Sequence, residues 1–143
     1  MRRFIDTNVL LYLVSGSAED SAKSVAAEEI LTEKDLALSV EVLQEFCFQV
    51  TRPSRPDRLS PEEALGLIES WVLRFPVQEM TMDIVRTAIG TASRYGISYW
   101  DAAIIEAART LTCGEVLSED LNDGQNYGGV RVRNPFRTSR RKR

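Results

Sequence analysis

The segment FIDTNVLL, residues 4–11, places an aspartate, a threonine and an asparagine between two apolar stretches. Residues 2–5 have the length and apolar content of a short strand, and the apolar spacing of residues 9–14 is typical of a helix. Asp6 therefore lies at a predicted strand-to-helix junction. An aspartate there either caps the helix that follows or forms one wall of a functional site, and the segment alone does not decide between the two.

Outward from this junction, short apolar segments alternate with helical patterns. Further strands are predicted at residues 36–40, 76–80, 114–118 and 129–132, and further helices at residues 19–34, 40–50, 61–75, 81–95 and 98–112. Strands that alternate with helices predict an α/β fold with a parallel sheet covered on both faces. The polar, proline-containing segment 51–58 is expected to be the most mobile loop.

The composition excludes several classes of enzyme. The chain has 143 residues, of which 43% are hydrophobic, and it contains no histidine. Catalytic triads, Cys-His pairs and imidazole bases are therefore excluded. Cys47 and Cys113 lie in apolar helical patterns, so we expect reduced core thiols rather than a zinc site or a disulfide. The start at Met1 and the absence of a long apolar run predict a cytoplasmic protein with no contact to a membrane.

The charge is distributed unevenly along the chain. The net charge is −3, yet residues 131–143 contain seven of the 18 basic residues and none of the 21 acidic ones. The body of the protein is therefore strongly acidic. We interpret the end of the chain as a solvated basic tail; the alternative is a strip that binds a polyanion.

Acidic residues recur where the predicted strands end, which is where functional groups gather in parallel α/β sheets. The acids that follow predicted strands are Asp6, Glu41, Glu45, Glu119, Asp120 and Asp123. One more acid, Asp101, lies in the first turn of the helix predicted from residue 98. Each has a structural explanation by itself, such as a capping box of Ser98 with Asp101. Together they predict a site for a hard divalent cation, because clustered carboxylates repel one another and such a cation relieves the repulsion.

Four segments in order, residues 4–11, 39–46, 97–104 and 117–124, resemble the motifs of PIN-domain ribonucleases, especially VapC-type toxins of bacterial toxin–antitoxin pairs. The resemblance spans about residues 3–135. It implies a three-layer α/β/α sandwich with a central parallel sheet. The nuclease domain would cover residues 1–136 and the basic tail residues 137–143. The tail is not something that the motifs require.

The resemblance also implies an activity and a set of site residues. It implies a Mg²⁺- or Mn²⁺-dependent endoribonuclease that leaves a 5′-phosphate and a 3′-hydroxyl, forms a homodimer and binds a cognate antitoxin protein. The catalytic and metal-binding acids would be Asp6, Glu45, Asp101 and Asp120, with Glu45 rather than Glu41 as the acid of the second segment. The supporting residues would be Thr7, Asn8, Ser118 and Asp123, of which Asp123 would either bind a second metal ion or only shape the turn before Gly124.

Other functions remain open from the sequence. The chain could be a PIN-fold nuclease of RNA processing that is not a toxin, or a catalytically silent module that binds RNA or protein. Two classes of phospho-acceptor fit the sequence less well. The haloacid-dehalogenase type needs a second aspartate two residues after the first, where this chain has Asn8. A receiver domain needs an acceptor aspartate after a middle strand and a lysine on a late strand, and the sequence shows neither clearly. Arg52, Arg55 and Arg58 are candidate contacts to RNA phosphates on charge alone.

Overall fold

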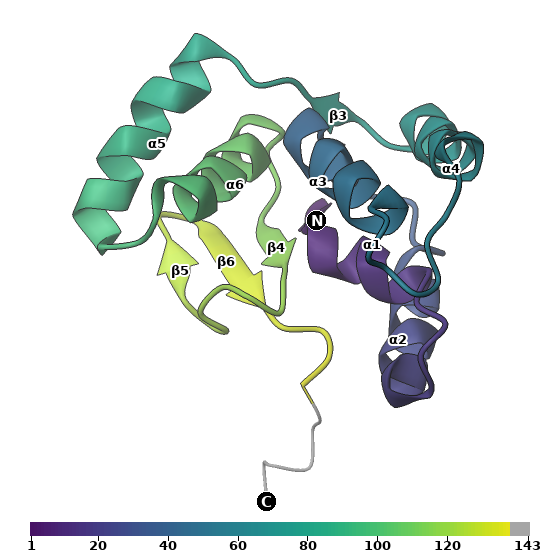
Figure 1. Ribbon diagram of the computed structural model, residues 1–143. Helices are drawn as coiled ribbons and strands as arrows, with labels where there is room; N and C mark the ends of the chain where they lie inside the picture. Colours follow the sequence, from purple (N-terminus) through teal and green to yellow (C-terminus); the bar gives the residue numbers. More distant parts are fainter. Residues whose placement is uncertain (138–143) are drawn as a thin grey trace, which may run out of the picture.

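The computed structural model describes residues 1–137 and contains one six-stranded sheet (Figure 1). The strands are β1 (Arg3–Ile5), β2 (Leu36–Ser39), β3 (Val77–Gln78), β4 (Glu115–Leu117), β5 (Asn126–Tyr127) and β6 (Val130–Arg133). Their order across the sheet is β3-β2-β1-β4-β6-β5. The neighbours run parallel except for β5 and β6, which form an antiparallel edge. The α/β prediction is confirmed, with this short edge hairpin as an addition.

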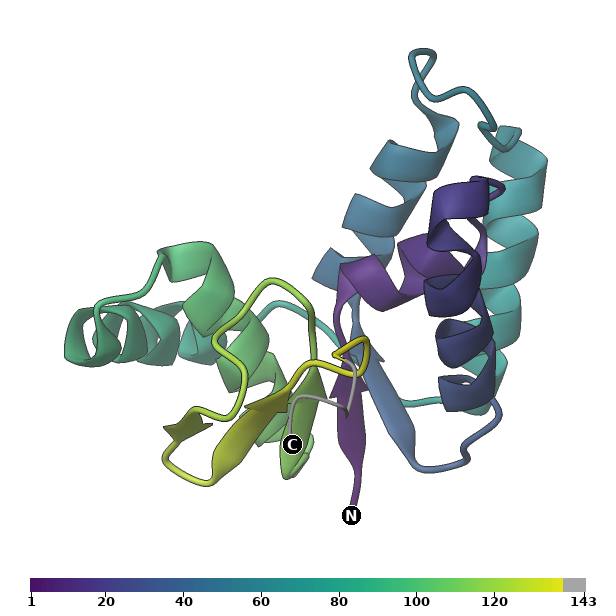
Figure 2. The same ribbon diagram turned by 90° about the horizontal axis from the view of Figure 1, so that it is seen from below.

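The helices form two groups. They are α1 (Thr7–Leu13), a 3₁₀ turn η1 (Ala18–Asp20), α2 (Ser21–Ile30), α3 (Val40–Thr51), α4 (Pro61–Arg74), α5 (Met82–Tyr95) and α6 (Tyr99–Thr110). Figure 2 shows α1 to α4 on one side of the molecule and α5 with α6 on the other. The two groups flank the central strands, so residues that follow those strands lie between them. Among residues 1–137, no helix combines the length and apolarity needed to cross a membrane.

Local sequence accounts for where the helices begin and end. At α4, Ser60 accepts a hydrogen bond from the Glu63 backbone, and the Glu63 side chain accepts one from the Ser60 backbone, a complete capping box. Ser39 and Thr81 cap α3 and α5 with their hydroxyls. Gly96 ends α5 in the left-handed conformation, with φ of 67°, which a side chain would disfavour.

The central strands hold the core. Phe4 and Ile5 of β1 are fully buried, as are all the hydrophobic residues of β2. Phe46 of α3 meets Trp71 of α4 edge-to-face, with the ring centroids 5.0 Å apart. Burial of such side chains stabilises the fold by about 1.5–3 kcal/mol each. The junctions that follow β1, β2 and β4 are thereby anchored on the buried core.

Two details of the sequence prediction differ from the structure. The predicted helix at residues 19–34 is divided into η1, which ends at Asp20, and the shorter α2, which begins at Ser21 and ends at Ile30. The edge strand β5 was not predicted, because its two residues are defined as a strand by their pairing with β6. Cys47 and Cys113 are free thiols, of which Cys113 is buried and Cys47 is partly buried.

Candidate active site

Asp6 is both a helix cap and a wall of a cavity. It follows β1 directly, and one carboxylate oxygen accepts a hydrogen bond from the Thr7 backbone at 2.7 Å. The other oxygen accepts a hydrogen bond from the Ser118 hydroxyl, also at 2.7 Å. Ser118 follows β4, the parallel neighbour of β1. Asp6 therefore caps α1 with one oxygen and is tied to the end of β4 by the other, and its side chain also lines the cavity; its catalytic role stays a prediction.

Asn8 links the start of α1 to the loop after β4. Its side-chain NH₂ donates to Asp120 at 3.2 Å and to the Ser118 hydroxyl at 3.5 Å, and its carbonyl accepts from the Glu119 backbone at 3.2 Å. The Asp120 backbone donates to the Ser118 hydroxyl at 3.1 Å. Asn8 and Ser118 thus orient the two aspartates, while Thr7 contributes its backbone N–H.

Asp101 enters from α6. The Ser98 hydroxyl accepts a hydrogen bond from the Asp101 backbone at 3.0 Å, which caps the helix. Among the hydrogen bonds of the described residues, none runs from the Ser98 backbone to the Asp101 carboxylate, in contrast to the closed box at α4. The Asp101 carboxylate is therefore available to the cavity, which it lines.

Glu41 and Glu45 both reach the cavity from α3, one helical turn apart. Glu45 is exposed and accepts a hydrogen bond from the Gln49 amide at 2.8 Å. Glu41 is half-buried, and its Oε1 atom is buried with no hydrogen-bond partner among the described residues. Burial and repulsion from Asp6 raise the pKa of Glu41. The sequence placed the two glutamates on one face of the helix but assigned the function to Glu45 alone.

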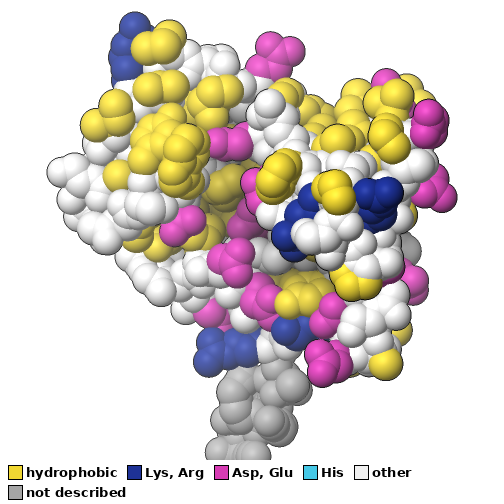
Figure 3. Space-filling view, viewed as in Figure 1, with side chains coloured by type: hydrophobic (Ala, Val, Ile, Leu, Met, Phe, Trp, Pro, Cys, Tyr) yellow, Lys and Arg dark blue, Asp and Glu magenta, His cyan; other side chains and the backbone are white. Residues whose placement is uncertain are grey.

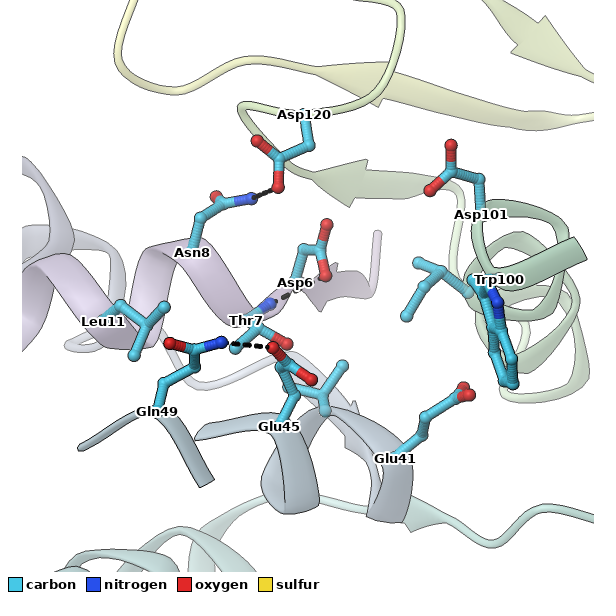
Figure 4. A pocket seen from close by; sticks show the side chains of 12 residues that line it. Asp6, Thr7, Asn8, Leu11, Glu41, Glu45, Gln49, Trp100, Asp101 and Asp120 are labelled. Carbon is cyan, nitrogen blue, oxygen red and sulfur yellow. Dashed lines mark hydrogen bonds between the residues drawn. The ribbon is translucent and has the colours of Figure 1, made fainter. Parts of the chain in front are cut away.

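These side chains enclose a cavity of about 480 Å³. Figure 3 shows acidic side chains gathered in the hollow at the middle of this face. Figure 4 shows Asp6 among the other acids, with Asp120 and Asp101 on one side and the glutamates on the other. The lining residues are Asp6, Thr7, Asn8, Leu11, Glu41, Val42, Glu45, Gln49, Trp100, Asp101, Ile104 and Asp120. All four acids of the predicted set are thus brought together.

The electrostatics of the cavity favour a cation. Burial raises the pKa of Asp6 to about 6, hydrogen bonds from Ser118 and Thr7 oppose that rise, and repulsion from Asp120 and Asp101 adds to it. None of the described lining residues is a lysine or an arginine. The negative charge that gathers here is therefore not balanced by a side chain in the wall.

The donor chemistry fits Mg²⁺ or Mn²⁺, but only with water in the coordination shell. Within residues 1–137, no group of three acidic or thiol side chains is placed to hold an ion directly. Mg²⁺ commonly binds proteins through one or two carboxylates and keeps several waters. The buried Oε1 of Glu41 and the carboxylates of Asp6 and Asp120 are the hard oxygen donors that such an ion uses. The residues present therefore fit the cation.

Asp123 lies away from this cavity. One of its carboxylate oxygens accepts a hydrogen bond from the Asn134 backbone at 2.7 Å, and the other accepts one from Arg137 at 2.6 Å. It is not among the residues that line the acidic cavity. These hydrogen bonds hold the turn against the chain that follows β6, and a role of Asp123 at a second metal stays a prediction.

The basic residues contribute little to the cavity wall. Arg55 pairs with Asp57 at 3.1 Å, and Asp57 also accepts a hydrogen bond from the Gly16 backbone at 2.8 Å. The loop is thereby tied to the segment between α1 and η1. Arg58 lines a separate hollow at the start of α4. The sequence predicted a basic tail at residues 137–143. Residues 138–143 lie outside the described residues, so this prediction is not tested.

A family model identifies the fold. The model of the PIN domain matches residues 3–122, most of the chain, so the protein belongs to the PIN domain family. The prediction made from the four segments is confirmed at this level. Among curated proteins, no sequence matches this chain.

Solved structures agree with this fold. A toxin–antitoxin complex from Klebsiella pneumoniae has a TM-score of 0.68 at 18% identity, over 95% of this chain and 99% of the other. VapC20 of Mycobacterium tuberculosis, a toxin that cleaves the sarcin–ricin loop, has a TM-score of 0.62 at 19% identity, over 82% and 91%. VapBC2 of Rickettsia felis, bound to promoter DNA, has a TM-score of 0.63 at 13% identity, over 94% and 98%. At these identities the likeness establishes the fold.

Proposed function

We propose that this protein is a Mg²⁺- or Mn²⁺-dependent endoribonuclease and the toxin of a toxin–antitoxin module. The observation that carries the proposal is the acidic cavity. Its carboxylates come from four separate segments, and no described lysine or arginine lines it. Such a cavity repels a phosphodiester unless a divalent cation is present, and it suits one that is.

The acidic side chains of the cavity would have different roles in binding the cation. Asp6 and Asp120, fixed by Ser118 and Asn8, would hold the cation. The other acids of the cavity, Glu41, Glu45 and Asp101, would hold its waters or complete its ligands. When bound, the cation supplies neutralisation of phosphate charge and lowers the pKa of a water molecule. Because hydrogen bonds fix the two aspartates, these side chains would hold the reacting groups in the correct geometry, and such positioning increases the reaction rate by a large factor.

The choice of RNA, and of a toxin, rests on similarity. The four sequence segments resemble VapC-type toxins, and toxins and toxin–antitoxin complexes share the fold. A cognate antitoxin and a second copy of this chain are the partners that this proposal includes. Arg52 and Arg58, which flank the loop before α4, are proposed contacts for RNA phosphates.

Cleavage of RNA tests the enzymatic part. Purified protein is incubated with a mixed RNA substrate and Mg²⁺ or Mn²⁺, and parallel reactions contain EDTA or the Asp6→Asn variant. We expect internal cuts with the metal and none in either control. Equal cutting by Asp6→Asn would refute the mechanism. A folded protein that binds RNA without cutting it would instead indicate a silent binding module.

Growth tests the toxin role. Expression in bacteria is expected to arrest growth, and the Asp6→Asn variant is expected to be harmless. Co-expression of the neighbouring reading frame should relieve the arrest if that frame encodes the antitoxin. A protein that cuts RNA in vitro but leaves growth unaffected would favour a nuclease of RNA processing over a toxin.

A further inference from the structure

The segment after β6 folds back onto the loop that carries Asp120. This loop spans residues 118–125, between β4 and β5, and residues 134–137 form the returning segment. At one flank of the loop, Asp123 accepts hydrogen bonds from the Asn134 backbone and from Arg137 through separate oxygens. The end of the described chain is thereby attached three residues beyond Asp120.

The other flank of the loop is attached through an aromatic and charged cluster. Glu119 accepts hydrogen bonds from the Tyr12 hydroxyl, at 2.5 Å, and from Lys23. The ring of Phe136 packs edge-to-face on Tyr12, with centroids 4.9 Å apart, and Lys23 Nζ lies 6.0 Å from the Phe136 centroid. Phe136 therefore covers the two groups that hold the residue next to Asp120.

Asp120 lies between these two attachments. Its own hydrogen bonds, from Asn8 to the carboxylate and from its backbone to Ser118, lie on the inner side of the loop. Repulsion from the neighbouring acids of the cavity favours movement of the Asp120 carboxylate outward into solvent. Attachments on both flanks oppose that movement, because they hold the loop backbone against β6 and α1.

We propose that Phe136 and Arg137 are positioning residues for Asp120, acting through Glu119 and Asp123 respectively. They touch no reacting group. The segment that closes the fold thus also sets the place of one acid of the cavity. The consequence for catalysis rests on the proposed function, whereas the effect on the order of the loop is independent of it.

Hydrogen–deuterium exchange of metal-free protein tests the proposal directly. We expect Phe136→Ala and Arg137→Ala to speed exchange of the peptide covering residues 118–125 by about tenfold, with peptides from α3 and α6 unchanged. The matched control is Arg86→Ala, which removes another exposed arginine–aspartate pair, with Asp83 on α5. Unchanged exchange of the 118–125 peptide in both variants, with the fold intact, would overturn the proposal.

A double-mutant cycle separates positioning from general stability. Asp123→Asn combined with Arg137→Ala should loosen the loop no more than Arg137→Ala alone, and Phe136→Tyr should restore the order that Phe136→Ala loses. Additive effects of Asp123→Asn and Arg137→Ala would refute the route through Asp123.

Ion binding and cleavage complete the test. Calorimetric Mn²⁺ affinity should fall about three- to tenfold in Phe136→Ala and Arg137→Ala, and kcat should fall more than KM changes. Loosened exchange in a protein that never cuts RNA would refute the proposed function and leave the positioning role intact. Impaired cutting with a rigid 118–125 loop would refute the positioning role alone.

Discussion

The two walls of the acidic cavity are built differently. In the wall after β1 and β4, side-chain hydrogen bonds join Asp6 to Ser118 and Asn8 to Asp120, residues more than 100 positions apart in the chain. In the helical wall, Glu45 accepts a hydrogen bond from Gln49, one turn away. Oε1 of Glu41 is buried without a hydrogen-bond partner among the described residues. Hydrogen bonds between distant residues therefore fix the acids of the first wall, which we call the locked wall. The acids of the second, the helical wall, are positioned mainly by the helix that carries them.

This difference indicates a division of labour. Preorganised groups need no rearrangement when a charged ligand arrives, and they set its position. Carboxylates on helices keep rotamer freedom and can adjust to the ligand. Four variants, taken from the largest expected effect to the smallest, test this contrast.

Removing a charge from the locked wall should have the largest effect. Asp120→Asn keeps the size of the side chain but removes its charge, and we expect cleavage to fall by more than about 100-fold, because residues that only support metal ligands already cost 10–100-fold. Single-turnover cleavage of RNA measures the change. Asp83→Asn on exposed α5 is the control, and a loss below tenfold for Asp120→Asn would remove Asp120 from the site.

Removing a hydrogen bond that fixes Asp6, without removing a charge, should have the next largest effect on cleavage. Ser118→Ala deletes the hydrogen bond to Asp6, and we expect cleavage to fall about 10- to 100-fold. Ser70→Ala, which removes an exposed hydroxyl bonded within α4, is the matched control for steady-state kinetics. Equal rates for Ser118→Ala and the wild type would show that the locked geometry is unimportant.

The stability of the metal-free protein should depend on Asp6. Because folding raises the pKa of Asp6 from 3.8 to about 6, the folded state binds its proton more tightly than the unfolded state does. The free energy of unfolding should therefore fall as the pH rises from about 4 through 6, by roughly 2 kcal/mol after allowance for partial exposure. Asp6→Asn should lose this slope and be the more stable protein at pH 8.

Urea unfolding in EDTA at several pH values measures the slope. Because Glu41 is also repelled by Asp6, its own contribution should shrink in the Asp6→Asn variant. A slope that is the same in the wild type and in Asp6→Asn would contradict the assignment of the pH dependence to this carboxylate.

The helical wall should give the smallest effect. Glu41→Gln removes one charge from a partly solvated site, and we expect Mn²⁺ affinity to fall about fivefold, the equivalent of about 1 kcal/mol. Calorimetry compares it with Glu28→Gln on exposed α2. If Glu41→Gln lowered Mn²⁺ affinity as much as Asp120→Asn does in the same calorimetric measurement, the helical wall would contribute as much to ion binding as the locked wall.

Much of the fold follows from local patterns. The alternation of apolar strands with helices, the serine and threonine caps, and Gly96 are short-range features, and the structure places helices and strands close to where they were predicted. The edge strand β5 is the exception. It is two residues long and is defined by pairing with β6, which is a contact between elements.

The candidate site was predicted in part. Parallel strand order brings Asp6, Ser118 and Asp120 to one edge, which a strand-end argument can foresee. The membership of Glu41 and the distance of Asp123 from the cavity depend on how α3 and the chain after β6 pack. No signal in the segment around Asp123 distinguishes a metal ligand from a partner of Arg137, because that partner lies 14 residues further along.

The sequence by itself determined the class of the protein: an α/β domain without histidine, with acids at strand ends and the segments of the PIN domain family. These properties depend on residue type and on spacing along the chain. Only the tertiary structure decided that Asp6 serves the cap and the cavity at once, that Glu41 joins the acids, and that Asp123 secures the returning chain. Each of these depends on a side chain meeting a residue distant in sequence, and no local pattern encodes such a meeting.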